Sequence, residues 1–408
     1  MQLRPRIAAL IDAYPRMLWL LAFGSFLNIG GLSFLWPLTT IYMHEHLGQP
    51  LTMAGLVLLV HSGAAALGQL AGGWLYDRIG ARPVMLTGLF ASASLTALLG
   101  FFDAFPIYVA VMIAFGFSAS LVFPSINALV ARAWPGGGRR AFNFVYVANN
   151  VGVAFGTALG GLIAGRSFAL AFLSASAVFA LFALFVLFAI RDPRAMEGTP
   201  SAGVTAELAA AREGREAPVP WLPIIALFIA FLTLWLIYVQ WQASVSVYMK
   251  ASGYELAAYS VLWTMNGVLI VAAQPLLSLV VRYLRRSSAQ MLLGTALYAA
   301  AFGVLLTSTS YWVFVASMVI LTFGEMLLWP TMPAAVARLS PPSMRGRLQG
   351  FILSGATFGR MLGPLVGGLL YDNAGFAILL VVMVAGLSIP LAAIALYGRT
   401  QPVEEPSF

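Results

Sequence analysis

Apolar residues occur along this chain in long runs, separated by short stretches that are polar or rich in Pro and Gly. A helix that crosses the hydrocarbon core of a bilayer needs about 20 such residues, and the runs show no strand-like alternation. We therefore expect an all-α membrane protein. The pattern predicts twelve spanning helices, at 17–43, 51–75, 83–102, 106–130, 141–164, 168–190, 221–248, 256–281, 290–308, 311–337, 348–371 and 376–397.

The basic residues test this count independently. If both termini are cytoplasmic, 19 of the 22 Lys and Arg residues lie on the cytoplasmic side, Arg166 and Lys250 lie on the opposite side, and Arg360 falls within a span. Positive charge collects on the cytoplasmic side of membrane proteins, and a wrong count would scatter it. The formal net charge of +8 is then a signal of orientation, and we expect no nucleic-acid partner.

Composition narrows the class of protein further. Hydrophobic residues make up 61% of the 408 and charged residues only 9%, against about a quarter in soluble domains, so most of the exterior must face lipid. Cysteine is absent, and the polar residues are too scattered to form a nucleophile, a metal cluster or paired catalytic acids. We expect no enzyme, no metal and no cofactor, and a monomer in a prokaryotic plasma (inner) membrane.

The chain contains an internal repeat. The segment FPSINALVAR (123–132) corresponds to WPTMPAAVAR (329–338), and GVAFGTALGG (152–161) corresponds to GRMLGPLVGG (359–368), at offsets of 206 and 207 positions. Parallel repeats of this kind are typical of transporters with a site near the midplane between the halves. We expect six-helix bundles at 1–190 and 220–408, joined by a polar cytoplasmic linker at 191–219.

Two motifs resemble a known family. The segment GGWLYDRIGARPVML (72–86) resembles the cytoplasmic signature of the major facilitator superfamily, with departures at Ala81 and Pro83. The repeated glycine segment resembles the motif of its drug/proton antiporter branch, although Thr157 replaces the usual proline in the first copy. The residues on pattern are Gly73, Leu75, Asp77, Arg78, Gly80 and Arg82 in the signature, and Gly152, Gly156, Gly160, Gly161, Gly359, Gly363, Pro364 and Gly367 in the glycine motif.

The resemblance implies a role for each motif. Asp77 is expected to meet the start of the eleventh span, near Arg345 and Arg347, and to latch the cytoplasmic ends of the two bundles together; a carboxylate suits the partial positive charge of a helix N-terminus. The other interpretation is a solvated loop. Glycines four residues apart share one helix face, where they allow close packing that can still slide.

Glu325 is the only charged residue between Ser287 and Ala337. It lies thirteen residues before the cytoplasmic Arg338, or about 20 Å along a helix, near the bilayer midplane. Charged groups at that depth cost on the order of 3 kcal/mol and usually mark ion or proton pathways. In the family's arrangement the first, fourth, seventh and tenth helices line a central cavity. We therefore predict that Glu325 exchanges a proton during transport.

Arg360 offers alternatives. It also lies thirteen residues from a cytoplasmic arginine, Arg347, so it shares the depth of Glu325, and the two could form a static ion pair between the tenth and eleventh spans. Arg360 could instead receive an anionic substrate. His61, in the second span, could relay protons, but a packing histidine is the favoured interpretation.

The remaining candidates are residues that could line a cavity. Aromatic rings and Met give adaptable apolar contacts and cation–π attraction, and amides add a few orienting bonds. They are Asn28, Trp36, Ser120, Asn127, Tyr238, Gln240, Trp241, Gln242, Met326 and Trp329. This mixture favours a proton-driven exporter of lipophilic, often cationic small molecules. The alternative is a symporter or exchanger for an organic anion or lipid that uses Arg360.

Overall fold

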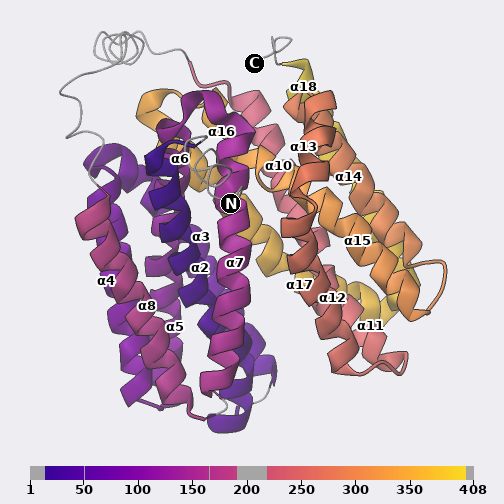
Figure 1. The fold of residues 1–408 in the computed structure, drawn as a ribbon. Coiled ribbons are helices and arrows are strands. Elements are labelled where there is room, and N and C mark those ends of the chain that lie inside the picture. The colour runs from indigo at the N-terminus through magenta and orange to yellow at the C-terminus, as the bar shows by residue number, and fades with distance from the viewer. Residues whose placement is uncertain (1–13, 50, 165, 191–217, 401–408) are drawn as a thin grey trace, which may run out of the picture. The chain divides into compact units, whose positions relative to one another are not determined.

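The computed structural model describes residues 14–49, 51–164, 166–190 and 218–400, and its regular elements are helices throughout this part of the chain (Figure 1). The first seven long helices are α2 (Arg16–Ile41), α3 (Leu51–Ile79), α4 (Ala81–Phe101), α5 (Phe105–Ser120), α6 (Val122–Ala133), α7 (Gly138–Ala164) and α8 (Phe168–Ala189). The later helices are α10 (Trp221–Tyr238), α11 (Ser246–Ala251), α12 (Leu256–Ala272), α13 (Gln274–Tyr283), α14 (Ser287–Val304), α15 (Tyr311–Leu328), α16 (Thr331–Leu339), α17 (Arg345–Gly386) and α18 (Ser388–Arg399).

These helices form two compact units. The first unit contains α2 to α8 together with Pro342–Gly350, and the second contains the described residues up to Pro341 and those from Phe351 onward. Helix α17 therefore begins in the first unit and continues in the second. Most of the expected linker, 191–217, lies outside the described residues, and the predicted domain limits stay a prediction.

The spans differ in number from the sequence-based expectation. Nine segments of the described chain are long and apolar enough to cross a membrane, or ten if α12 and α13, which meet at a bend of 60°, count as one span. Two of the twelve expected spans, 348–371 and 376–397, run together in one candidate of 58 residues, Pro342–Arg399. Inside it, Gly375 has a φ of 82°, which marks a break that glycine accommodates readily. The expected span 290–308 corresponds to α14, which begins with the polar residues Ser287 and Ser288 and is not one of the nine candidate segments.

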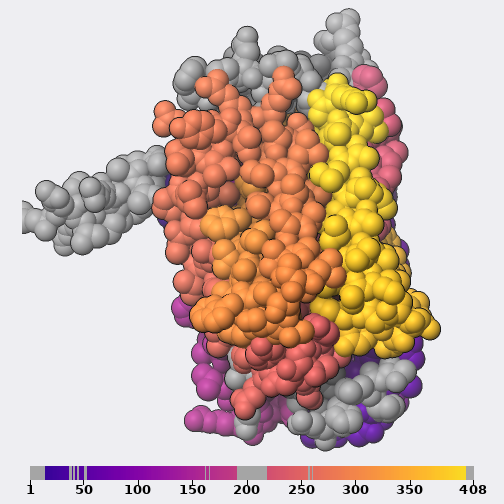
Figure 2. Space-filling view, turned by 90° about the vertical axis from the view of Figure 1, so that its right-hand side faces the viewer, coloured from indigo at the N-terminus to yellow at the C-terminus, as the bar shows by residue number. Residues whose placement is uncertain are grey.

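Large apolar side chains lie on the outside of both units. Figure 2 shows the face of the second unit where α14 and α15, in orange, lie beside the C-terminal helices, in yellow. Trp312 in α15 is 75% exposed, and Val381, Ile389 and Leu396 are also exposed. Contiguous apolar surface of this kind is rare on soluble monomers, so it indicates a lipid-facing exterior.

The glycine motif of α7 packs directly on α2. A Cβ atom at Gly156 would collide with the carbonyl oxygen of Gly30 and lie 2.8 Å from the Ser33 Cβ, and one at Gly160 would lie 2.9 Å from the Phe34 Cα. A Cβ at Gly152 would likewise meet backbone of α2. Only glycine lets the two helices approach so closely.

The second unit repeats this arrangement between α17 and α10. Cβ atoms at Gly359 and Gly363 would meet the carbonyl oxygens of Leu232 and Leu236, and one at Gly367 would meet the Gln240 amide. The α10 partners are offset from their α2 counterparts by 206 positions, as Leu232 is from Phe26. The internal repeat is thus present in how each unit packs its own helices.

These contacts predict the effect of adding one methyl group. Gly156→Ala should lower the stability of the protein by about 1–3 kcal/mol, because the Cβ meets backbone that cannot move aside cheaply. The matched control is Gly55→Ala in α3, where a Cβ meets nothing within 4 Å and helix propensity improves by about 1 kcal/mol. Thermal unfolding of the purified protein in detergent measures both. Equal stability of the two variants would contradict the close packing of α2 and α7.

Candidate functional site

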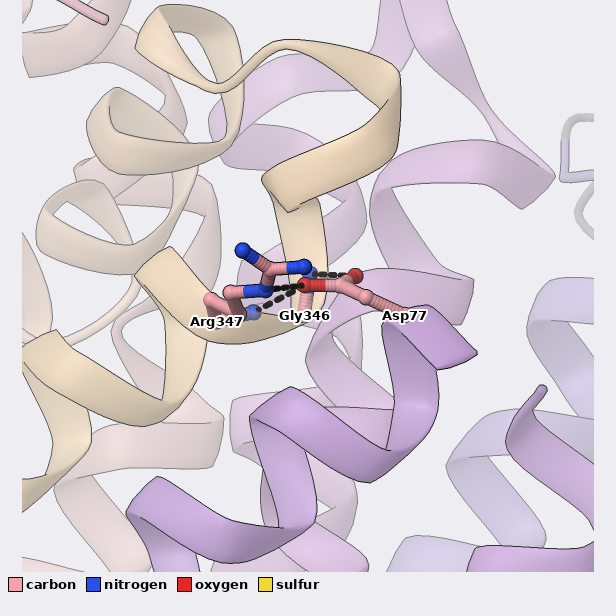
Figure 3. Close-up of polar contacts among 3 residues, drawn as sticks. All are labelled: Asp77, Gly346 and Arg347. Carbon is pink, nitrogen blue, oxygen red and sulfur yellow. Dashed lines mark hydrogen bonds and ion pairs between the residues drawn. The ribbon is translucent and has the colours of Figure 1, made fainter. Parts of the chain in front are cut away.

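A carboxylate clamps the start of α17 within the first unit. The Asp77 side chain, at the end of α3, accepts hydrogen bonds of 2.9 Å from the backbone N–H groups of both Gly346 and Arg347 (Figure 3). The Nε of Arg347 adds an ion pair at 3.4 Å. Only 2% of the Asp77 side chain is exposed, against 43% for Arg347. The carboxylate therefore satisfies two of the N–H groups that a helix N-terminus leaves without partners.

The rest of the signature shapes this contact. Gly73 lies against Gly346, so that a Cβ on either residue would collide with backbone of the other. Gly80 has a φ of 89° and forms the turn between α3 and α4, a conformation that favours glycine. Arg78 lies over the Trp74 ring at 3.8 Å, and Arg82 donates to the Leu187 carbonyl at 2.6 Å. The residues of the signature are therefore packed and hydrogen-bonded against other helices and do not form a solvated loop.

Glu325 lies in the interior of the second unit, with 2% of its surface exposed. The Asn266 Nδ2, from α12, donates to the Glu325 Oε1 at 2.5 Å and to the Thr322 hydroxyl at 2.9 Å. The side chains of Tyr238 and Trp329 also hydrogen-bond to the carboxyl group. An ionised carboxylate can only accept hydrogen bonds, and the neighbours of Glu325 are arranged to donate them.

No basic residue in the described part of the chain, Arg360 included, forms an ion pair with this carboxylate. Arg360 instead donates to the Thr357 hydroxyl at 3.1 Å, and its Cζ lies 4.6 Å from the centroid of the Trp235 ring. The static ion pair weighed from the sequence is therefore not formed in this structure.

An aromatic cluster separates the two charged groups. The rings of Trp235 and Trp329 stack at 4.5 Å with 10° between their planes. Tyr238 meets Trp329 edge-on at 5.5 Å, and Phe231 and Tyr298 meet the same ring at 5.6 and 5.9 Å. Arg360 therefore contacts one indole of the stack and Glu325 contacts the other.

The other cavity candidates are scattered. Gln240 is fully buried and donates to the carbonyls of Gly363 and Leu236, so its amide holds α10 to α17. Asn28 is also fully buried, and neither atom of its amide has a hydrogen-bond partner among the described residues. Ser120, Trp241 and Met326 are buried, and Asn127 and Gln242 are partly exposed. The surroundings of Trp36 and Gly161 lie outside what the structure describes.

Three residues around Glu325 and its aromatic neighbours were not predicted from the sequence: Asn266, Thr322 and Trp235. Asn266 is one amide in an apolar span, and Thr322 is a small polar residue on the same helix as Glu325. Trp235 lies three residues before Tyr238 on α10; that spacing places two residues on one helix face and is a signal that could have found it. His61 donates from its Nδ1 to the Met112 carbonyl at 2.7 Å, as a packing histidine does. Within the described residues no three His, Asp or Glu side chains gather to hold a metal.

The clamp predicts a difference between two variants. Asp77→Asn should raise the rate at which Leu348→Cys reacts with a maleimide by about tenfold or more. The two N–H groups donate to different oxygens of Asp77, and Asn replaces one of these oxygens with an NH2 donor, at a cost of about 1–3 kcal/mol. The chain has no other cysteine, and Leu348 is buried next to the clamp. Arg347→Ala should change the rate far less, since an exposed ion pair contributes only about 0.2–1 kcal/mol.

The control is Asp103→Asn, whose carboxylate is 82% exposed and which should leave labelling unchanged. If Arg347→Ala released the cysteine as strongly as Asp77→Asn, the ion pair and not the backbone hydrogen bonds would hold α17.

The comparisons with known proteins agree with this geometry. A family model described as Major Facilitator Superfamily matches residues 21–290 and 256–407. The chain is 41% identical over 388 residues to the "Uncharacterized MFS-type transporter YttB" of Bacillus subtilis (strain 168), covering 94% of this chain and 96% of that protein. It is 25% identical to YqjV of the same organism, another uncharacterized MFS-type transporter, over 93% of this chain and 92% of that protein.

Solved structures share the fold. The crystal structure of the human organic anion transporter MFSD10 (TETRAN) superposes with a TM-score of 0.73 at 18% identity, covering 93% of this chain and 99% of that one. A POT family transporter in complex with 5-aminolevulinic acid superposes with a TM-score of 0.69 at 18% identity, covering 95% and 97%. The chain therefore belongs to the major facilitator superfamily and is a multi-pass membrane transporter, not an enzyme.

Proposed function

We propose that the chain is a proton-coupled secondary active transporter that exports lipophilic, often cationic small molecules by alternating access, in the drug/proton antiporter branch of its superfamily. The observation that supports this most is the Glu325 carboxyl group, which is buried, has no counter-ion among the described residues and is held by neutral donors. Intramembrane carboxyl groups of this kind usually belong to ion or proton pathways.

The proton step involves one bond. An O–H bond forms at Glu325 when a proton arrives from the outer side, and it breaks when the site opens inward and the proton returns to water. Neutral donors suit both states, because an amide or an indole N–H stabilises a carboxylate without a fixed cation that would keep it ionised. One proton moving across 100 mV supplies about 2.3 kcal/mol, enough for a gradient of roughly fifty-fold in a neutral cargo.

The topology proposed is twelve spans with both termini in the cytoplasm of a prokaryotic cell, in its plasma membrane. The segmentation of the helices supports this count. Ten candidates become twelve if α14 is added and if Pro342–Arg399 is divided at Gly375. The distribution of basic residues, 19 of 22 on one side, supports the orientation.

The clamp at Asp77 supports a conformational cycle. Helix α17 starts in the first unit and continues in the second, so the hydrogen bonds from Gly346 and Arg347 fix one end of an element that both units share. Their release is proposed to accompany opening to the cytoplasm. The glycine contacts of α2 with α7 and of α10 with α17 provide surfaces that can slide.

A second candidate function is supported by Arg360. Its guanidinium makes no ion pair within the described residues, so it is available to an organic anion or an anionic lipid. The direction of transport would then be inward for a symporter, or exchange of one anion for another.

Transport by the reconstituted protein tests the proton coupling. In proteoliposomes loaded with a lipophilic dye, an imposed pH gradient should drive dye movement by the wild type, and Glu325→Gln should abolish the gradient-driven part while passive leakage is unchanged. The matched control is Glu255→Gln, the same chemical change at an exposed position before α12, which should behave as wild type. Dye movement that ignores the gradient in the wild type, or that responds to it in Glu325→Gln, would reject the proposal.

A further inference from the structure

The two charged groups of the Glu325–Arg360 region differ in how open they are. Glu325 is 2% exposed and surrounded by its donors. Arg360 is partly exposed, and none of its nitrogens is among the buried polar atoms that lack a partner. The donors that Arg360 does not use on Thr357 have no partner among the described residues and are not sealed completely. Of these two groups, the positive one is the less enclosed.

Arg360 has unused hydrogen-bonding capacity. A guanidinium carries five N–H donors in a planar fork, and the structure gives Arg360 one hydrogen bond, to the Thr357 hydroxyl, and one ring contact, with Trp235. No carboxylate pairs with it in the part of the chain that the structure describes. Buried or half-buried guanidinium groups are stable mainly when paired, so an acceptor from outside the chain fits this position.

A second unused donor lies beside it. The Nε1 of Trp235, whose ring carries the Arg360 guanidinium, is buried and has no hydrogen-bond partner among the described residues. Buried polar groups are nearly always satisfied, and an exception calls for an explanation. Two donors that the protein leaves unused at one place, next to a flat indole surface, form a site for a ligand that carries acceptors on an aromatic body.

The cation already on the ring disfavours a second cation. An aromatic face attracts one positive charge at about this distance, and the Trp235 face is taken by the guanidinium at 4.6 Å, while its other neighbour in the stack is Trp329. A cationic ligand would have to displace Arg360 or bind next to it, and two like charges in a site of low dielectric repel strongly.

We propose that Arg360 determines the charge preference of the cargo: together with Trp235 it binds lipophilic aromatic molecules through an anionic group such as a carboxylate. This inference rests on the proposed transport of lipophilic molecules and specifies its cargo at this site: among the lipophilic molecules that the proposed function allows, acidic or zwitterionic ones are preferred to cations. If the guanidinium is removed, the groups left at the site are the indole faces and the Glu325 carboxyl group. Both attract positive charge, so the site should then prefer cations.

The test is a binding measurement with two probes of opposite charge and the same ring system, naphthoate and naphthylmethylammonium. The full chain is placed in lipid nanodiscs, binding is measured by equilibrium dialysis, and empty nanodiscs give the partitioning to subtract. The wild type should bind naphthoate about tenfold or more tightly than the amine, since a charge-assisted, bidentate contact contributes at least that factor. Arg360→Gln should invert the order.

Three further variants separate charge from folding. Arg360→Lys keeps the charge without the planar fork, so it should bind naphthoate more weakly than wild type but still prefer it to the amine. Trp235→Phe keeps a ring and removes the N–H, and should weaken naphthoate more than the amine. Arg285→Gln removes an exposed arginine of the same unit and should change neither probe.

Three results would overturn the proposal: a wild type that prefers the amine, an Arg360→Gln variant in which both probes change by the same factor, or no saturable binding of either probe to the wild type. Because no pH gradient is imposed, the outcome does not depend on proton coupling. If Glu325→Gln lost gradient-driven transport but the binding measurement showed no charge preference, this inference would be rejected and proton coupling would stand. If the charge preference depended on Arg360 but Glu325→Gln kept gradient-driven transport, proton coupling would be rejected and this inference would stand.

Discussion

The chemistry proposed for this transporter depends on one constraint: the Glu325 carboxyl group is buried, and none of the residues that the structure describes serves as its counter-ion. In a medium of low dielectric an ionised carboxylate is costly unless it is paired or hydrogen-bonded. The second unit meets that cost with hydrogen bonds from an amide, a phenol and an indole instead of with a cation. Since none of these donors carries a fixed charge, the carboxyl group is not committed to one ionisation state by a partner. That is the property that a proton carrier needs.

The aromatic stack connects this group to the rest of the site. Trp329 hydrogen-bonds to Glu325 and stacks on Trp235, whose ring also contacts the guanidinium of Arg360. The two charged groups do not touch each other. Each contacts one indole of the stacked pair, so a movement of either group would act on a ring that packs against the ring of the other. In the proposed cycle Glu325 binds the proton and Arg360 binds the cargo, and the two stacked indoles connect these groups.

Much of the fold could be predicted from the sequence because span length and the placement of arginines obey simple rules. The glycine repeats also identified the faces that pack closely, although their partners in α2 and α10, such as Gly30 and Leu236, carry no signal of their own. The count of spans was less clear, because a bend separates α12 from α13 and because α17 joins two helical stretches across the break at Gly375.

The site was predictable only in part. Glu325 could be singled out because it is alone among apolar residues, and Asp77 because it lies within a signature. Asn266 could not, since its contact with Glu325 joins positions 59 residues apart and a single amide in an apolar span is not a pattern. Equal depth suggested that Arg360 and Glu325 pair, but depth does not fix the direction of a side chain around its helix, and the indole stack separates them.

The central claim is that the Glu325 carboxyl group gains and loses a proton in the working protein. Infrared difference spectroscopy of the protein in lipid measures this directly, because a protonated carboxylic acid has a carbonyl band that its carboxylate lacks. The account predicts a band that appears and disappears reversibly as the pH changes across the range in which the protein transports, and that is missing from Glu325→Gln. A wild-type spectrum with no titrating band that Glu325→Gln removes would contradict it.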